Sequence, residues 1–469
     1  MRRHLSTAEH VHFIGIGGYG MSAIARVMLE KGYKVSGSDV VRQERTDKLA
    51  AQGARIYIGH KPEHVSGANL VVYSTAIAQD DVERKAAEER NIPVIHRSQM
   101  LARLLNAGKG IAVAGAHGKT TTSSMIALVM ESCGLDPTYI IGGEIVNLDT
   151  NAKAGNGEYV VAEADESDGS FLQYQPHTAV VTNIEPDHLE NYDGDFGKLK
   201  EAYVQFLRQV KPEGAAVVCV DDPNIRELLP RLSGTRIISY SIESGGEADY
   251  RAMDITPGDR KVSFTVIRRG ERLGRVELSV PGRHNAGNAL AAIAVCLEAG
   301  LSFERVAEAI RLFRGAKRRF QVIGETGGIL VIDDYAHHPT EIQATIAAAK
   351  ATGKRIIAVF QPQRYTRTFF LLDAFSRSFA EADEVVITDI YSPAGEKAIE
   401  GVTSKRLAEL IVKNSNPNTI YLPTKEDALT WLLERVAPGD LVLTMGAGDI
   451  WKTAEQLARE LHGRFAASG

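Results

Sequence analysis

An apolar run that leads into a glycine-rich turn and then into a helix-compatible segment occurs twice in this chain. The first copy passes from residues 11–14 (VHFI) into Gly15–Gly20, and the second from residues 111–114 (IAVA) into Gly115–Gly118. A buried strand, a glycine turn and a helix together form the start of a βαβ unit, whose strands pair in parallel. The repeat therefore restricts the fold to the α/β class with parallel sheets.

Strands and helices alternate along most of the remaining chain. Further strands are predicted over residues 34–37, 70–73, 93–95, 159–162, 179–182, 329–332, 355–360, 384–387, 419–422 and 441–444. Helices are predicted over residues 81–90, 120–131, 288–299, 370–382, 404–413, 425–435 and 451–461. Two segments between the second and third blocks, residues 261–267 and 275–280, alternate like the strands of a hairpin and predict a small antiparallel excursion.

The chain length of 469 residues favours about three domains. We place them at residues 1–107, 108–317 and 318–469, with polar linkers at residues 106–110 and 315–319. The formal net charge is only −5, which argues against a protein that coats nucleic acid. No stretch of about 18 apolar residues occurs, so no membrane span is expected. Three scattered cysteines give neither a zinc motif nor a disulfide framework, and a cytoplasmic location follows.

The first turn has the pattern GxGxxG, formed by Gly15, Gly17, Gly18 and Gly20 within residues 15–20. Glycines at these places let a phosphate approach backbone N–H groups at a helix N-terminus. Asp39 follows 19 residues after the last glycine, where a carboxylate can accept ribose hydroxyls. Taken alone, the pattern indicates a dinucleotide or another nucleotide diphosphate; the alternative is a tight turn without a ligand.

The second turn, GAHGKTTT at residues 115–122, is a phosphate loop with one departure. The usual first glycine of that motif would fall at Val113. The remaining parts still supply backbone donors, a lysine for the β- and γ-phosphates and a hydroxyl for Mg²⁺. We therefore expect a nucleoside triphosphate at this turn.

Four carboxylates follow the strand at residues 159–162, namely Glu163, Asp165, Glu166 and Asp168. The carboxyl end of a parallel strand is where ligands of open sheets bind, so this crowding predicts a bound cation. The alternative is a solvated acidic loop. His188 follows the next strand and is a candidate for the same metal, although a lone histidine is more often structural.

Two further polar segments follow strands of the third block, residues 333–339 (DDYAHHP) and 361–368 (QPQRYTRT). Both loops are expected on one face of the sheet. Arg364 and Arg367 offer forked donors for a carboxylate or a phosphate, with ordinary surface ion pairing as the alternative.

The combination of motifs resembles the Mur ligase family. The resemblance covers all three predicted domains and rests on the following segments: GIGGYGMSAIA (15–25), GAHGKTTT (115–122), EADESDGSF (163–171), TNIEPDH (182–188), GRHNAGNALAA (282–292), DDYAHHPTE (333–341) and QPQRYTRT (361–368). It implies a Rossmann-like UDP-binding first domain, a P-loop ATPase-like second domain with the antiparallel excursion, and a Rossmann-like third domain.

The resemblance also implies ligands for particular residues. The UDP-sugar would contact Gly15, Gly17, Gly18, Gly20, Asp39, Ser74 and Thr75. ATP would contact Gly115, Ala116, His117, Gly118, Lys119, Thr120, Thr121, His284, Asn285, Asn288, Arg319 and Asp334. Thr120 and Glu163 would hold one Mg²⁺, for which Mn²⁺ is a substitute, and His188 would serve a second. Catalysis would involve Lys119, His337, Arg364 and Arg367; Gln363 departs from the histidine that is more frequent there.

Within the family, the motifs are most similar to those of the enzymes that attach L-alanine to UDP-N-acetylmuramate in peptidoglycan precursor synthesis. The resemblance implies an ATP-dependent ligase that forms an acyl phosphate and acts as a monomer or homodimer. One alternative is the recycling ligase that adds a murein tripeptide to the same sugar nucleotide. Alternatives from other classes are an NAD-dependent oxidoreductase, which leaves the phosphate loop unexplained, and a nucleotide-gated interaction protein.

Overall fold

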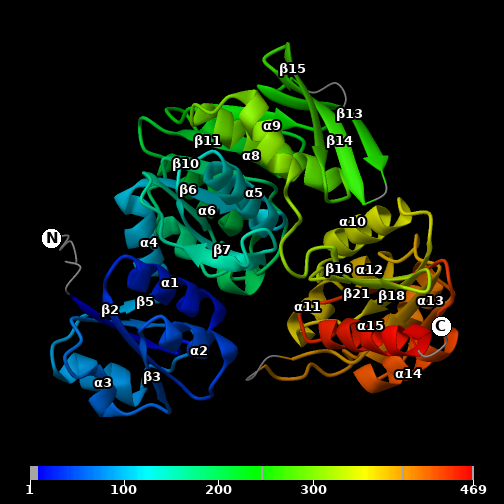
Figure 1. Ribbon diagram of the computed structural model, residues 1–469, viewed down its shortest axis with the longest axis horizontal. Helices are drawn as coiled ribbons and strands as arrows, with labels where there is room; N and C mark the ends of the chain where they lie inside the picture. Colours follow the sequence, from blue (N-terminus) through cyan, green and yellow to red (C-terminus); the bar gives the residue numbers. More distant parts are fainter. Residues whose placement is uncertain (1–8, 244–246, 259, 393–395, 467–469) are drawn as a thin grey trace. The chain divides into compact units, whose positions relative to one another are not determined.

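The computed structural model describes residues 9–243, 247–258, 260–392 and 396–466 (Figure 1). Contacts divide the chain into two compact units. The first unit comprises Met1–Met253, Thr265–Gly274 and Gly287–Leu312, and the second Asp254–Phe264, Arg275–Ala286 and Phe313–Gly469. Three sheets are present, one in each predicted domain, and the predicted α/β class is confirmed.

The N-terminal sheet is parallel, with the strand order β3-β2-β1-β4-β5. Its strands are β1 (His10–Ile14), β2 (Lys34–Asp39), β3 (Arg55–Ile58), β4 (Leu70–Tyr73) and β5 (Val94–His96). Its helices are α1 (Tyr19–Glu30), α2 (Glu44–Ala51), η1 (Pro62–Val65), α3 (Val82–Glu89) and α4 (Arg97–Ala107). Because the strand order reverses between β1 and β4, the loops that follow these two strands lie where open α/β sheets generally bind ligands.

The middle sheet has the order β15-β14-β13-β12-β11-β10-β6-β9-β7-β8. Its strands are β6 (Lys109–Ala114), β7 (Thr138–Ile145), β8 (Thr150–Lys153), β9 (Tyr159–Glu163), β10 (Thr178–Val181), β11 (Ala215–Cys219), β12 (Ile237–Ser241), β13 (Tyr250–Gly258), β14 (Lys261–Arg268) and β15 (Glu271–Leu278). The connection between β14 and β15 is the pair Arg269 and Gly270, both with positive φ (48° and 86°). Two such residues are typical of a type I′ hairpin, so the expected antiparallel excursion is present.

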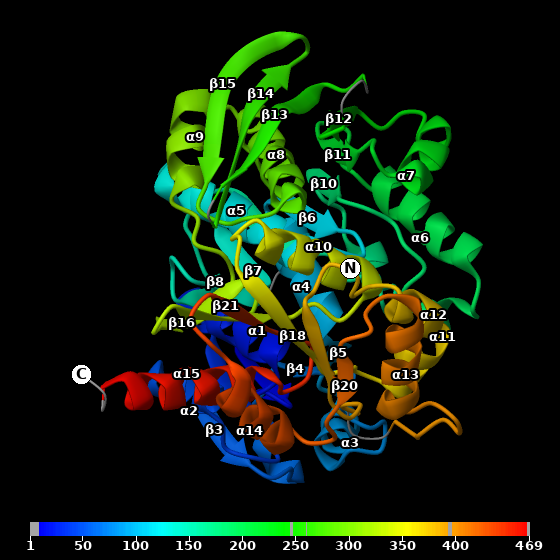
Figure 2. The ribbon, with the colours of Figure 1, turned by 90° about the vertical axis from the view of Figure 1, so that its right-hand side faces the viewer.

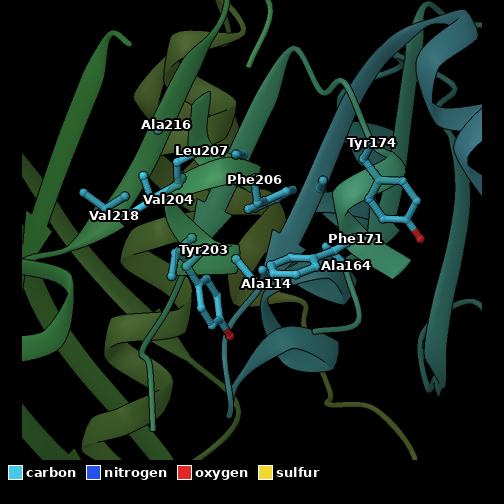
Figure 3. Packing of buried hydrophobic residues seen from close by; sticks show 14 of the residues in the cluster. Ala114, Ala164, Phe171, Tyr174, Tyr203, Val204, Phe206, Leu207, Ala216 and Val218 are labelled. Atoms are coloured by element: carbon cyan, nitrogen blue, oxygen red, sulfur yellow. The ribbon is translucent and has the colours of Figure 1, made fainter. Parts of the chain in front are cut away.

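Helices cover the middle sheet, and the strand β6 at its centre carries the phosphate loop. The helices are α5 (Lys119–Ser132), η2 (Ser170–Gln173), η3 (Leu189–Tyr192), α6 (Phe196–Arg208), α7 (Pro223–Leu228), η4 (Leu229–Arg231), α8 (Arg283–Glu298) and α9 (Phe303–Arg311). On one face, Phe206 of α6 stacks on Phe171 with ring centroids 5.0 Å apart (Figure 3). Small residues of the strands, Ala114 and Ala216, leave room for these rings.

The C-terminal sheet has the order β16-β17-β21-β18-β19-β20. Its strands are β16 (Gln321–Thr326), β17 (Ile329–Asp334), β18 (Arg355–Phe360), β19 (Glu384–Ile387), β20 (Thr419–Tyr421) and β21 (Asp440–Met445). Its helices are α10 (Pro339–Lys350), α11 (Tyr365–Phe370), α12 (Leu372–Ser376), α13 (Ser404–Asn414), α14 (Lys425–Arg435) and α15 (Trp451–Ala466).

Both faces of the C-terminal sheet are buried. Alternate residues of one strand belong to different cores: Ile356 and Ala358 pack with α13, whereas Ile357 and Val359 pack with α14 and α15. Figure 2 shows α12 and α13 on one side of these strands and α14 and α15 on the other. Burial on both faces explains why the predicted strands are continuous apolar runs rather than alternating ones.

Two predicted boundaries are wrong. The helix expected over residues 370–382 is replaced by α11 and α12, which are separated at Leu371. Serine hydroxyls in this segment, Ser376 and Ser378, donate to the carbonyl oxygens of Asp373 and Ala374, and such bonds compete with helix propagation. The linker expected at residues 106–110 is reduced to Gly108, because α4 ends at Ala107 and β6 begins at Lys109.

None of the described helices is long and apolar enough to cross a membrane. The cysteines Cys133, Cys219 and Cys296 are all free thiols.

A close backbone approach beside the first glycine turn gives a test of the N-terminal packing. A Cβ added at Gly37 on β2 would lie 2.5 Å from Ile16 Cδ1 and 2.6 Å from the Phe13 carbonyl oxygen. Gly37→Ala is therefore expected to destabilise the fold by about 1–3 kcal/mol, visible as a lower melting temperature in circular dichroism. Gly463→Ala on α15, where nothing lies within 4 Å, is the matched control. Equal melting temperatures for the two variants would contradict the prediction.

Candidate active site

The phosphate loop connects β6 to α5 through two glycines in conformations that other residues rarely adopt. Gly115 has φ +134° and Gly118, the N-cap of α5, has φ +83°. A Cβ at Gly118 would lie 2.5 Å from Asn288 Oδ1, and this side chain also accepts a hydrogen bond from Thr122 (3.3 Å). The predicted nucleotide residue Asn288 thus lies against the loop. The N–H groups at the start of α5 have no intrahelical partner, as at any helix N-terminus, and such groups are suited to an anion.

The end of β10 holds this loop in place. The Asn183 side chain accepts from the His117 N–H (2.9 Å) and donates to the His117 carbonyl oxygen (3.0 Å). The Thr182 hydroxyl donates to the same carbonyl oxygen. The His117 ring in turn lies 3.4 Å from a Glu185 carboxylate oxygen. Most of the loop's conformation is therefore fixed by residues about 65 positions away, which local sequence patterns do not reveal.

Lys119 points back into its own loop and pairs with Glu166. Its ammonium lies 2.8 and 3.0 Å from the two Glu166 carboxylate oxygens and also donates to the Gly115 carbonyl oxygen. Burial lowers the pKa of Lys119, but Glu166 and Asp165 outweigh this and raise it above its ordinary value. Burial raises the pKa of Glu166, which the ammonium opposes. The two short contacts fit an ionised pair, so the lysine is charged.

The predicted metal ligands Glu163 and Thr120 lie on elements that flank the loop. Glu163 ends β9 and is paired in register with Val113 of β6, while Thr120 occupies the first turn of α5. One Glu163 oxygen accepts the Gly142 N–H at 2.6 Å. Carboxylate and hydroxyl oxygens are the ligands that Mg²⁺ prefers, so this donor set fits the ion.

His188 has the left-handed conformation (φ +55°) and its ring lies 3.5 Å from Asp187. Its role as a metal ligand stays a prediction.

The first glycine turn is held by its neighbours in a similar way. The Gly17 N–H donates to the Asp39 carboxylate (2.8 Å), and Ser74 Oγ would lie 3.2 Å from a Cβ on Gly15. Ser74 follows β4, so the structure brings together the ends of β1 and β4, between which the strand order reverses. Asp39 orients the turn in this structure; its contact with a ribose stays a prediction. Thr75 hydrogen-bonds the His96 ring at 2.9 Å.

Arg97 is a candidate that the sequence did not single out. It begins α4, and one of its nitrogens would lie 3.4 Å from a Cβ on Gly20. The other lies 3.9 Å from Asp165 and 4.0 Å from Asp168. Within the first unit, this guanidinium lies between the first glycine turn and the acidic segment. Both ion pairs are longer than hydrogen bonds, so its donors remain suited to an anionic substrate group.

In the second unit, the candidate residues lie at the carboxyl ends of β17 and β18, as predicted. Asp334 is 7% exposed and accepts the N–H groups of Phe320 (2.6 Å) and Ala336 (2.7 Å). Burial raises its pKa to about 6, against the opposing effect of Arg319. Arg319 lies 3.4 Å from Glu341, and its guanidinium carbon lies 5.2 Å from the centre of the Tyr335 ring.

Hydrogen bonds and backbone conformation orient the histidine and arginine candidates of the second unit. The ring Nδ1 of His337 lies 2.9 Å from the Tyr335 carbonyl oxygen. Arg364 has φ +71°, and Arg367 donates to Gln363 Oε1 (2.8 Å). Gln363, the one departure from the expected motif, therefore orients the buried Arg367.

Glu396 holds the start of the arginine segment and was not predicted. Its carboxylate accepts the N–H groups of Tyr365 (3.1 Å) and Thr366 (3.2 Å).

The remaining nucleotide candidates of the second unit, His284 and Asn285, lie at the start of α8. His284 is exposed, whereas Asn285 is buried and donates to the Pro281 carbonyl oxygen at 2.6 Å.

Family models match nearly the whole chain. The model of the Mur ligase family, catalytic domain, matches residues 10–109. The Mur ligase middle domain matches residues 113–296, and the Mur ligase, glutamate ligase domain, matches residues 318–448.

Curated relatives are similar over almost their full lengths. The UDP-N-acetylmuramate–L-alanine ligase of Symbiobacterium thermophilum is 50% identical over 461 residues, covering 97% of this chain and 95% of the relative. The enzyme of the same name from Pelotomaculum thermopropionicum is 51% identical over 454 residues, covering 97% and 98%.

Solved structures agree with these relatives. The UDP-N-acetylmuramate-alanine ligase MurC from Thermotoga maritima has a TM-score of 0.79 at 29% identity, covering 98% of this chain and 100% of that one. A murein peptide ligase from Psychrobacter arcticus has a TM-score of 0.69 at 26% identity, covering 97% and 99%.

The support of the phosphate loop by β10 can be tested with Asn183→Ala. The variant loses both hydrogen bonds to His117, so the loop N–H groups lose their orientation, and we expect ATP affinity to fall about tenfold, or ~1.4 kcal/mol. The measurement is calorimetric titration with ATP and Mg²⁺. Asn191→Ala, an exposed asparagine in η3, is the control and should bind like the wild type. Unchanged affinity in Asn183→Ala would refute the role given to this side chain.

The raised pKa of Asp334 predicts a pH dependence of stability. Because the folded pKa of about 6 lies above the ordinary 3.8, the fold favours the protonated carboxyl. Stability from this group is present below pH 4 and is lost as the pH rises through 6. Relative to Asp334→Asn, the wild type should therefore lose roughly 2–3 kcal/mol between pH 4 and 7, measured by urea unfolding. A difference between the two proteins that does not change with pH would contradict this.

Proposed function

Since the chain belongs to the Mur ligase family, we propose that it joins L-alanine to the lactyl carboxylate of UDP-N-acetylmuramate, with cleavage of ATP. The observation that carries the proposal is the identity of 50% over 461 residues to a ligase of that name. The recycling ligase for murein peptides is the second candidate, and a solved enzyme of that kind is similar at 26% identity. The curated relatives named UDP-N-acetylmuramate–L-alanine ligase, at 46–51% identity over almost the full chain, favour single amino-acid addition. A peptidoglycan precursor would be the product.

The chemical problem is that a carboxylate is a poor electrophile. Transfer of the γ-phosphoryl group of ATP to the lactyl carboxylate gives an acyl phosphate and releases ADP. The amine of L-alanine then attacks the acyl carbon, phosphate leaves, and the amide remains after the amine has lost its protons. One ATP is consumed for each amide formed.

Lys119 and the start of α5 would stabilise the transferred phosphoryl group. The lysine is kept charged by Glu166, and a cation placed against the β- and γ-phosphates offsets the negative charge that develops during transfer. Glu163 and Thr120 would hold Mg²⁺, which supplies further neutralisation of phosphate charge.

The sugar nucleotide would extend from the first glycine turn toward the phosphate loop. The N-terminus of α1, which begins at Tyr19 directly after the turn, would offer N–H donors to its diphosphate, and Arg97 lies between the turn and the acidic segment. A guanidinium at this place would guide an anionic group toward Lys119.

The second unit would supply the groups that receive L-alanine. Arg364 and Arg367 follow β18 and offer donors to the amino-acid carboxylate. His337 is the candidate base for the alanine ammonium, because imidazole titrates near neutral pH. A cytoplasmic location, and a monomeric or homodimeric state, complete the proposal; the free cysteines support the former.

The test measures phosphate release from ATP and Mg²⁺ with UDP-N-acetylmuramate, comparing L-alanine with the murein tripeptide and detecting products by mass. We expect release with L-alanine and a product heavier by one alanine residue. Preference for the tripeptide would assign the recycling reaction, and no substrate-dependent release would reject both.

Lys119→Ala is the variant that tests the site itself, and its turnover should fall at least 10³-fold, as expected for loss of phosphoryl-charge stabilisation. Because the substitution leaves the buried Glu166 without its cation, the double variant with Glu166→Gln controls for folding. Lys109→Ala, at the start of β6 and far from the loop, removes a half-exposed lysine and should keep wild-type turnover. Wild-type turnover in Lys119→Ala would defeat the assigned role.

A further inference from the structure

Glu83 is a fully buried carboxylate in the N-terminal domain that none of the predicted sites includes. It is the second residue of α3 and has 0% exposure. A buried carboxylate is costly unless donors surround it, and its burial raises its pKa. Hydrogen bonds reverse that effect, and the pKa of Glu83 is lowered to about 2. The group is therefore ionised, and the fold has built a set of donors for it.

The donors come from four different elements of the domain. One carboxylate oxygen accepts from Ser38 Oγ of β2 (2.5 Å) and lies 3.1 Å from His12 Nε2 of β1. The other accepts the Lys61 N–H (3.0 Å), which follows β3, and lies 2.7 Å from His64 Nδ1 of η1. A single carboxylate thus ties β1, β2 and the segment after β3 to the start of α3.

Further side chains extend this set into a buried polar network. The Ser36 hydroxyl lies 2.7 Å from both His12 Nδ1 and His10 Nε2. His60 Nδ1 lies 2.9 Å from Ser38 Oγ, and the His64 ring stacks on Tyr57 at 4.0 Å. We call Glu83, His10, His12, Ser36, Ser38, His60 and His64 the Glu83 network.

Ser38 connects this network to the first glycine turn. While its hydroxyl donates to Glu83, its carbonyl oxygen accepts the N–H groups of Gly15 (2.8 Å) and Ile16 (3.0 Å). The next residue, Asp39, accepts the Gly17 N–H. The position of Ser38 consequently determines where three successive N–H groups of the turn point.

We infer that Glu83 is a positioning residue for the UDP-sugar, acting through Ser38 on the glycine turn at residues 15–17. This inference rests on the function proposed above. Glu83 does not reach the nucleotide itself. Its charge attracts the Ser38 hydroxyl and the donors of β1 and η1, and the end of β2 is thereby fixed at the distance that the turn requires.

An uncharged side chain of the same shape cannot do this. In Glu83→Gln one oxygen becomes an NH₂ group. If it replaces the oxygen that accepts the Lys61 N–H, that hydrogen bond is lost; if it replaces the other, the Ser38 hydroxyl must change from donor to acceptor, and in both cases the negative charge is gone. The end of β2 and the turn would then sample other conformations. Binding of UDP-sugar should weaken while the phosphate loop, on a different sheet, is unaffected.

The competing explanation is a purely structural network that fixes α3 against the sheet. It predicts a lower melting temperature without a selective change in substrate affinity. The two explanations can be distinguished, because only a positioning role raises the KM for UDP-N-acetylmuramate while the KM values for ATP and L-alanine stay unchanged.

The experiment compares Glu83→Gln and Ser38→Ala with the wild type in steady-state ligation and in calorimetric binding of UDP alone. We expect the KM for UDP-N-acetylmuramate to rise about tenfold in Glu83→Gln and at least threefold in Ser38→Ala. UDP affinity should fall by the same factors. KM values for ATP and L-alanine should stay within twofold of the wild type. The KM for UDP-N-acetylmuramate in the double variant should be no higher than in Glu83→Gln, because both substitutions break the same connection between Glu83 and Ser38.

Glu63→Gln is the matched control, since Glu63 lies on η1 beside the network but is exposed. It should behave like the wild type. If Glu83→Gln does not fold, Ser38→Ala alone tests the inference, because this variant keeps the other hydrogen-bond donors that stabilise the buried Glu83 carboxylate.

Unchanged KM and UDP affinity in Ser38→Ala, or an equal rise in the KM for ATP, would overturn the inference. A wild type without substrate-dependent phosphate release would instead reject the proposed function, and UDP calorimetry would still test the role of Glu83.

Discussion

A glycine turn has no side chains with which to hold itself in place, and the two turns that follow β1 and β6 are each fixed by a polar side chain from another strand end. Asn183 holds the phosphate loop, and Asp39 holds the first turn. Glycine has the largest conformational entropy to lose on folding, and the loop N–H groups are useful to an anion only when they point the same way. The parallel sheets satisfy this requirement because they bring the carboxyl ends of neighbouring strands to a common edge.

The fold accommodates its buried carboxylates in two different ways. Glu166 faces the ammonium of Lys119, so one buried ion neutralises another. Glu83 and Asp334 both accept hydrogen bonds from backbone N–H groups. The pKa of Glu83 is lowered to about 2, whereas that of Asp334 is raised to about 6. The number and kind of donors explain the difference, since Glu83 also contacts a hydroxyl and two imidazoles, whereas two N–H groups do not outweigh burial at Asp334.

The sequence predicts those parts of the structure that depend on local pattern. Strands such as 70–73, 355–360 and 384–387 are where their apolar runs indicate, because burial on both faces leaves no room for polar residues. The glycine turns and the acidic segment were likewise recognisable. The helix at 370–382 failed because serine hydroxyls and Leu371 interrupt it, which helix periodicity does not register. The supports of the site were not predictable for another reason: Asn183 is 66 residues from His117, and Glu83 is 71 residues from His12.

If a triphosphate binds at the loop, as proposed above, the contact between Lys119 and Glu166 links nucleotide binding to the acidity of the solution. The phosphate groups would attract the ammonium away from Glu166. The carboxylate would then remain in a buried place that favours its neutral form, and a proton from solvent would compensate for the lost cation. Binding would thus exchange one counter-ion of Glu166 for another, a lysine ammonium for a hydrogen ion. The apparent affinity for the nucleotide would depend on pH even with Lys119 charged throughout.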